Sequence, residues 1–289
     1  MGFATAFAGR LRSLTSRALG TLREGKNVAV EIKSRAEIEK MRATCRLAAE
    51  VLDFIEPHVV PGVTTGALDR LCHEFIVKHR AYPSPLNYKG FPKSICTSPN
   101  EVVCHSIPGD RVLVAGDIIN LDITTTLGGY FGDCSEMYVV GGETNPDAQK
   151  LVDVTRESLW LGIREVGPGK RIGDIGQAIS DFAGKQHGYG VVEAFCGHGI
   201  GREFHMAPQV SHVGKSGTGL RLKPGMTFTI EPMINMGTKH CDILADGWTA
   251  VTQDRKWSAQ AEHTILVTDH GYEVLTARAR GYRPAWATA

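Results

Sequence analysis

Two stretches of this sequence resemble each other at a constant offset of 107 positions, and this repetition constrains the fold more than any single motif. The pair Pro61-Gly62 opens the first stretch, and Pro168-Gly169 opens the second. Apolar residues follow at the spacing of an amphipathic helix, at Leu68, Leu71, Cys72 and Phe75 and again at Ile175, Ala178, Ile179 and Phe182. Amphipathic helices can resemble one another by chance, but the shared offset favours a duplicated unit. Two such units could pack around a pseudo-two-fold axis.

Each half of the chain also carries two acids in the same order. Asp122 and Glu231 each lie six residues after a glycine, inside an apolar run typical of a buried strand. Asp133 and Glu262 each precede a β-rich stretch. A buried carboxylate needs a counter-charge. Together with His198, the four acids suit two divalent cations, because carboxylates favour ions such as Mn and imidazole suits Zn and Fe. This ligand set predicts a two-metal hydrolase.

The remaining pattern predicts one α+β domain over residues 35–289. The run Ser34-Arg35-Ala36-Glu37 resembles a capping box and should open a helix with its apolar face at Ile38, Met41, Cys45, Ala48 and Leu52. Further helices are predicted over residues 64–80, 147–164 and 172–187. Strands are predicted up to about residue 141 and through residues 195–276. No low-complexity linker separates the halves.

Residues 1–34 differ from the rest of the chain. Arg10, Arg12, Arg17 and Arg23 all precede the first acid, Glu24, among small and hydroxylated residues. This basic amphipathic segment could be an organellar transit peptide or a surface-binding helix. Four arginines do not separate these alternatives, and we favour a weakly ordered extension.

Composition excludes several classes of partner and compartment. A net charge of +1 gives no bias toward nucleic acid, and no apolar stretch approaches a membrane-spanning length. The seven cysteines include no C-x-x-C pair, and the first residues lack a secretory signal. We therefore expect reduced thiols in a cytoplasmic monomer, or in an organelle if residues 1–34 act as a transit peptide.

Four strings closely resemble type 1 methionine aminopeptidases over roughly Ser34 to Thr276. They are Tyr88–Ser94 (YKGFPKS), Asn100–His105 (NEVVCH), Gly197–His205 (GHGIGREFH) and Met226–Met233 (MTFTIEPM). The resemblance implies the pita-bread fold, also called creatinase/aminopeptidase-like: a curved antiparallel sheet covered by helices, with a pseudo-two-fold axis through a metal site. The chain departs from the family at Met206-Ala207, where many members carry acids.

The resemblance also implies a role for each candidate site residue. Asp122 would bind one divalent metal, His198 and Glu231 the other, and Asp133 and Glu262 both. The metals would be Co, Mn, Fe or Zn, and a shared hydroxide would attack the first peptide bond. His105, His205 and Glu231 would be catalytic. The substrate methionine would contact Tyr88, Phe91, Cys96, His105, Phe204, His205 and Trp248. A monovalent cation would lie near Asn100, Val102 and Ser258.

The implied activity is removal of the initiator methionine from nascent proteins whose second residue is small. Nascent N-termini would be the partners, with the ribosome as a further candidate. Three alternatives stay open: a proline-specific aminopeptidase or prolidase, a non-catalytic binding module of the same fold, and a ribosome- or membrane-bound scaffold that acts through residues 1–34.

Overall fold

The computed structural model describes residues 29–287. The basic segment predicted at residues 1–34 therefore lies mostly outside the described part of the chain. Within residues 29–287, no helix is both long and apolar enough to cross a membrane.

The helices follow the predicted pattern closely. The α-helices are α1 (Arg35–Ile55), α2 (Thr65–Lys78), α3 (Pro146–Arg164) and α4 (Ile172–Ile179). The shorter helices are η1 (Glu56–His58), η2 (Tyr88–Gly90), the π-helical η3 (Ser180–Gln186) and η4 (Ala285–Ala287). The capping box at Ser34 is confirmed, since its side chain accepts from the Glu37 N–H and the Glu37 carboxylate accepts from the Ser34 N–H. The helix predicted over 172–187 is α-helical only to Ile179 and then widens into a π-helix.

Fifteen strands form three antiparallel sheets within the described residues. The first-half strands are β1 (Tyr82–Pro83), β2 (Cys96–Pro99), β3 (Val102–Cys104), β4 (Ile118–Leu127) and β5 (Tyr130–Val139). The next are β6 (Gly190–Val191), β7 (Gly197–Gly199), β8 (Met206–Val210), β9 (Thr227–Ile230) and β10 (Met233–Asn235). The last are β11 (Cys241–Ile243), β12 (Ala250–Thr252), β13 (Ser258–Gln260), β14 (Glu262–Val267) and β15 (Tyr272–Val274).

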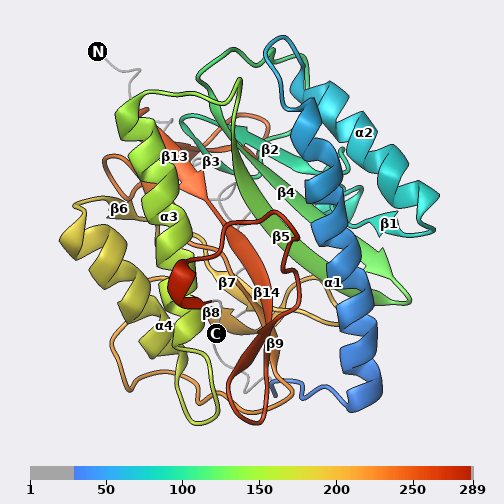
Figure 1. The fold of residues 1–289 in the computed structure, drawn as a ribbon, viewed down its shortest axis with the longest axis vertical. Helices are drawn as coiled ribbons and strands as arrows, with labels where there is room; N and C mark the ends of the chain where they lie inside the picture. Colours follow the sequence, from blue (N-terminus) through green and yellow to red (C-terminus); the bar gives the residue numbers. More distant parts are fainter. Residues whose placement is uncertain (1–28, 288–289) are drawn as a thin grey trace, which may run out of the picture.

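The main sheet is symmetric about the seam between β5 and β14. Its central order is β4-β5-β14-β9, so the strand pair of the first half, β4 and β5, meets the strand pair of the second half, β9 and β14, where β5 pairs with β14. The glycines that start the two acid-bearing runs, Gly116 and Gly225, have φ of 91° and 86°, a conformation that glycine adopts without steric cost. The helix pairs α1/α2 and α3/α4 lie over the two halves (Figure 1). This arrangement agrees with the repeat predicted from the sequence.

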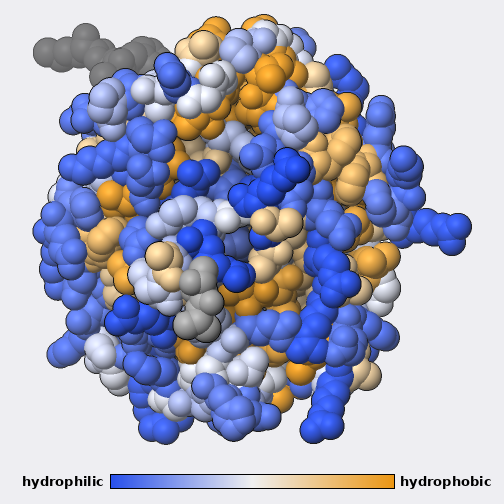
Figure 2. Space-filling view, in the orientation of Figure 1, coloured by the Kyte–Doolittle hydropathy of each residue, from blue (hydrophilic) through white to orange (hydrophobic). Residues whose placement is uncertain are grey.

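Strand alternation separates the two faces of the sheet. Ile119, Leu121 and Ile123 on β4 point toward α1 and α2, where they join a buried cluster with Leu52 and Leu68. A second cluster packs α3 and α4 against β9 and β14. The outer side of this helix-covered face is mainly hydrophilic (Figure 2). The alternate residues of β4 and β5 therefore face the opposite side of the sheet, where Asn120, Thr124 and Asp133 are buried away from these helices.

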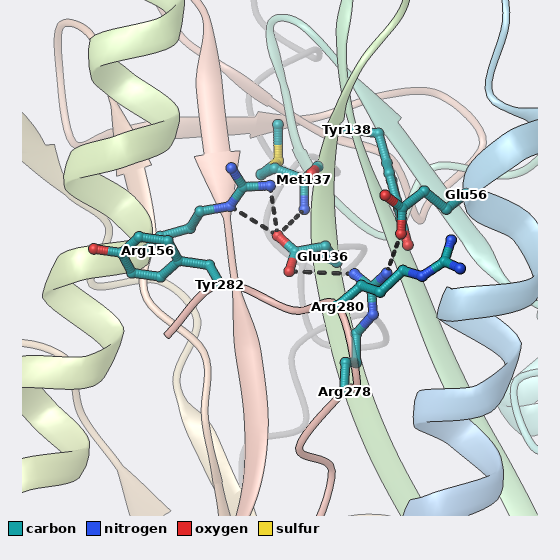
Figure 3. A pocket seen from close by; sticks show the side chains of 8 residues that line it. All are labelled: Glu56, Glu136, Met137, Tyr138, Arg156, Arg278, Arg280 and Tyr282. Atoms are coloured by element: carbon teal, nitrogen blue, oxygen red, sulfur yellow. Dashed lines mark hydrogen bonds and ion pairs between the residues drawn. The ribbon is translucent and has the colours of Figure 1, made fainter. Parts of the chain in front are cut away.

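An ionic cluster fastens the C-terminal segment to the helix-covered face. Arg278 reaches Asp53 at 2.8 Å, Glu56 at 2.6 Å and Glu136 at 3.3 Å, with only 3% of its side chain exposed. Arg156 holds the other oxygen of Glu136 at 2.9 Å. Glu56, Glu136, Arg156 and Arg278 line a hollow of about 260 Å³ (Figure 3). Because Glu136 points away from the face that carries Asp133, this hollow is not the predicted catalytic site.

Candidate metal centre

Strand register brings the predicted acids to one face of the sheet. Asp122 on β4 lies opposite Ser135 on β5, and Glu262 on β14 lies opposite the same Ser135. Asp133 is two residues from Ser135, so all three acids share a face. Glu231 follows Ile230, which pairs with His263, and so lies beside Glu262. The sequence placed Asp133 before a strand; it is instead the fourth residue of β5, which begins at Tyr130.

His198 joins these acids from β7. Ligand atoms of Asp133, His198 and Glu262 all lie within 4.8 Å of one another. The His198 Nε2 atom is 3.5 Å from an Asp133 oxygen and 3.6 Å from a Glu231 oxygen. All of these side chains are largely buried, with Asp122 the most accessible. The structure therefore brings Asp133, His198 and Glu262 within ligand distance of one another, with Glu231 beside His198 and Asp122 on the same face of the sheet.

Hydroxyl groups orient the acids from the same face. Thr124 donates to Asp133 at 2.7 Å, and Thr229 donates to Glu231 at 2.8 Å. The sequence analysis missed both threonines, although each lies two residues from a predicted ligand, the spacing that shares a strand face. It also missed His212, whose Nε2 accepts the backbone N–H of Glu231 at 3.1 Å. No strand pattern marks His212, since it lies in the loop after β8.

The acids repel one another in the protein alone. Burial and the charges of Asp133 and Glu231 raise the pKa of Asp122 well above its ordinary value. Burial and the other acids likewise raise the pKa of Glu262. Burial raises the pKa of Glu231 to about 7, although His198 opposes this change. Burial alone would lower the pKa of His198, but its hydrogen bond with Asp133 and the Glu231 charge raise it.

These residues fit divalent cations. One oxygen of Glu262, Oε1, is buried without a hydrogen-bond partner among the described residues. Buried polar atoms normally have partners, so an unpartnered carboxylate oxygen inside an acidic cluster indicates a missing positive ligand. Four carboxylates and an imidazole match the oxygen and nitrogen preferences of Mn, Fe, Co and Zn. The donor set and the unpartnered oxygen point to the same conclusion.

The two histidines predicted to be catalytic flank this cluster. The His205 ring lies 4.1 Å from the His198 ring, and its Nδ1 is 3.0 Å from the Tyr88 hydroxyl. His105 has a positive φ of 58° and packs edge-on against Phe195 at 5.5 Å. Burial lowers the pKa of His105 to about 4. Burial and the neighbouring His198 lower the pKa of His205. Both imidazoles are therefore neutral near pH 7.

The residues predicted to contact the substrate methionine come from segments far apart in the chain, and some of them meet in pairs. Phe204 lies 4.8 Å from Tyr88, and Phe91 meets Trp248 edge-on at 5.2 Å. Cys96 on β2 pairs with Asp122 on β4, so this predicted substrate contact lies beside one of the predicted metal ligands. Burial raises the pKa of Cys96 well above its usual value, which leaves an unreactive thiol. All seven cysteines are free.

The residues predicted to bind a monovalent cation also meet. The Ser258 N–H donates to the Asn100 carbonyl at 2.8 Å, and Val102 on β3 pairs with Val251. The Ser258 hydroxyl donates to Asn235 at 2.8 Å. Cation binding here stays a prediction.

Known proteins share both this sequence and this fold. The chain matches metallopeptidase family M24 over residues 39–269. A methionine aminopeptidase from Haemophilus influenzae is 52% identical over 253 residues, which cover 87% of this chain and 94% of that relative. The crystal structure of methionine aminopeptidase from Rickettsia prowazekii is 52% identical with a TM-score of 0.85, covering 86% of this chain and 100% of that one.

A more distant structure bears on the fold alone. A prolidase from Pyrococcus furiosus superposes with a TM-score of 0.67 at 20% identity, covering 86% of this chain and 66% of that one. The predicted pita-bread fold and the resemblance to type 1 methionine aminopeptidases are thus confirmed. The chain belongs to metallopeptidase family M24 and, within it, to the methionine aminopeptidases.

Proposed function

We propose that this chain removes the N-terminal methionine of polypeptides whose second residue is small, with the help of two divalent cations. The observation that carries the proposal is the convergence of four acids and His198 on one face of the sheet, with Phe204 and His205 packed beside His198. The relatives named methionine aminopeptidases support the same substrate.

The five ligands would share the cations between the halves of the molecule. Asp122 would bind one cation, His198 and Glu231 the other, and Asp133 and Glu262 both. The four negative charges balance two divalent cations, which removes the repulsion between the acids. When bound, such cations supply Lewis acidity and bring the pKa of a water molecule close to neutral.

The surrounding residues would orient the substrate and move protons. Neutral His205 can donate a hydrogen bond to the carbonyl oxygen of the first peptide bond. Neutral His105, which packs against Phe195, can exchange a proton with the leaving amine. Glu231, whose carboxylate lies 3.6 Å from His198, is a further candidate to carry a proton between these steps.

Specificity would come from the pocket lined by Tyr88, Phe91, Cys96, Phe204 and Trp248. Aromatic walls favour a flexible thioether through sulfur contacts of about 0.3 to 1.5 kcal/mol each. One methylene changes the preference of such a pocket by only about 1 to 3 kcal/mol, so close analogues of methionine should also be cleaved.

The decisive experiment is hydrolysis of a Met-Ala-Ser peptide after metal removal and after addition of each candidate metal. Activity should require metal and should be lost in Asp133→Ala and Glu262→Ala. An X-Pro peptide tests the prolidase alternative in the same assay. Cleavage of X-Pro in preference to Met-Ala-Ser, or full activity in both variants, would refute the proposal.

We also propose nascent chains as the physiological substrate and the cytoplasm as the compartment. Ribosome binding and targeting through residues 1–34 stay predictions. Deletion of these residues, followed by peptidase assays and localisation in cells, separates a targeting role from a catalytic one.

A further inference from the structure

Lys33 is a buried lysine with no part in the chemistry proposed above. Its side chain is 1% exposed, and within residues 29–287 its ammonium group has one ion pair, with Glu31 at 3.4 Å. Burial lowers the pKa of Lys33. An ammonium group in a dry environment is unfavourable unless it is well paired, so packing alone does not favour lysine at this position.

The Lys33 side chain lies against Gly201, at the start of the loop that carries Phe204 and His205. A Cβ atom at Gly201 would come within 2.5 Å of Lys33 Cε and 2.7 Å of its Nζ. The backbone N–H of Lys33 donates to the Gly225 carbonyl at 2.8 Å. Lys33 is therefore held between the His205 loop and the turn that leads into β9.

Arg202 fastens the same loop from its outer side. Its Nη2 is 3.4 Å from Glu37 Oε1, and its guanidinium lies 4.8 Å from the Tyr130 ring. The Tyr130 hydroxyl donates to the same Glu37 oxygen at 2.9 Å. Glu37 is fixed in turn by the capping box with Ser34, and Tyr130 is fully buried. The first turn of α1 thus provides a rigid attachment for the loop.

A chain of contacts connects this attachment to the catalytic face. The Phe131 N–H donates to the Gly201 carbonyl at 2.9 Å, and the Phe131 ring stacks on Phe204 at 5.6 Å. The ring centroids of Phe204 and His205 are 4.2 Å apart, and those of His205 and His198 are 4.1 Å apart. A shift of Gly201 or Arg202 would therefore move His205 relative to the metal cluster.

We propose that Lys33 and Arg202 are positioning residues for His205. Neither touches the substrate or the metals; both act by fixing the loop from Gly201 to Met206. Displacement of a catalytic group by about 1 Å can cost on the order of 100-fold in rate. Loss of either residue should therefore lower kcat more than it raises KM. This inference rests on the proposed function, because His205 matters only if the chain is the peptidase described above.

The first test is Lys33→Met, which keeps an unbranched side chain as far as Cε and removes the charged Nζ atom that packs against Gly201. Replacement of a buried ion by an apolar group of similar volume is often neutral or stabilising. We expect an unchanged or higher Tm together with an approximately tenfold lower kcat on Met-Ala-Ser. A purely structural role for Lys33 would change Tm and leave kcat intact, and that result would overturn the proposal.

Arg202→Ala provides a second variant in case Lys33→Met folds poorly. Its matched control is Arg111→Ala, since Arg111 is also exposed and forms one ion pair, with Glu101 at 3.6 Å. We expect a fall in kcat of about fivefold for Arg202→Ala and no change for Arg111→Ala. Equal behaviour of the two variants would overturn the role of Arg202.

A double-mutant cycle shows whether the effect passes through His205. In a His205→Asn background, Lys33→Met should produce less than a twofold further loss, whereas independent effects would multiply. The imidazole NMR resonances of His205 in metal-free protein should also shift in Lys33→Met and not in Arg111→Ala. Multiplicative losses or unshifted resonances refute this inference alone, whereas an inactive wild type refutes the proposed function.

Discussion

Removal of Arg278 should destabilise the protein without changing the geometry of the predicted metal ligands. The Arg278 side chain is only 3% exposed and pairs with three acids on the helix-covered face, of which Figure 3 shows Glu56 and Glu136. Two of these, Asp53 and Glu136, are themselves largely buried, with 27% and 11% of their side chains exposed. In Arg278→Met both would lose a partner, and Arg156 alone would be left to compensate Glu136.

The expected loss follows from the burial of these groups. Breaking a buried pair by removal of one member costs about 3 to 5 kcal/mol, because the remaining charge is left uncompensated. The contact with Glu56, which is 43% exposed, adds little. We take about 3 kcal/mol, since Arg156 still pairs with Glu136. For a domain of this size, 1 kcal/mol corresponds to roughly 2 to 4 °C, so Tm should fall by about 6 to 12 °C.

Thermal unfolding of the metal-free protein, followed by circular dichroism, measures this change. The matched control is Arg280→Ala, because Arg280 lines the same hollow and forms no ion pair within residues 29–287. Its Tm should stay within about 2 °C of wild type. A decrease in Tm of less than about 3 °C for Arg278→Met, or an equal decrease for Arg280→Ala, would refute the argument from buried charge.

Three further changes probe the site. Glu262→Gln should lower activity on the order of 100-fold. It should also raise the Tm of metal-free protein at pH 8, because an acid whose pKa is raised on folding costs stability above its ordinary pKa, whereas Gln does not titrate; a lower Tm would contradict this. Burial lowers the pKa of His212 to about 3, so the unfolded state gains a proton first as pH falls below about 6.5, and the folded state loses stability. Between pH 7 and 5, the free energy of unfolding in urea should therefore fall by about 2 kcal/mol less in His212→Gln than in wild type. An equal fall in both proteins would exclude His212 as the cause. Trp248→Ala should raise KM for Met-Ala-Ser about two- to tenfold through lost sulfur contacts, whereas the distant Trp286→Ala should not.

Local patterns predicted much of the fold. The capping box at Ser34 and the helical periodicity after Gly62 and Gly169 are short-range signals, and the helices begin within two residues of the predicted positions. The π-helix after Ile179 was not predicted, because the same apolar spacing fits both helix types over one turn. The start of β5 was also missed, since Asp133 was read as a boundary although it lies within the strand.

Long-range partners could not be predicted in the same way. The four acids were found because each lies within an apolar run or beside a β-rich stretch, but their distances from one another depend on the register of β5 against β14. His212 and Arg278 lie in segments without periodicity, and their partners, Glu231 and Asp53, are distant in the sequence. The roles of these two residues depend on their burial by tertiary packing, and this burial cannot be predicted from the neighbouring sequence.

The seam between β5 and β14 has a consequence for the timing of synthesis. Asp122 and Asp133 are synthesised before His198, Glu231 and Glu262. The first half alone therefore holds two of the four acids and lacks the histidine. A chain still growing on the ribosome cannot assemble the complete ligand set until residue 262 has emerged and β14 has paired with β5. Activity therefore has to wait until both halves of the duplicated unit have been synthesised and their inner strands have paired.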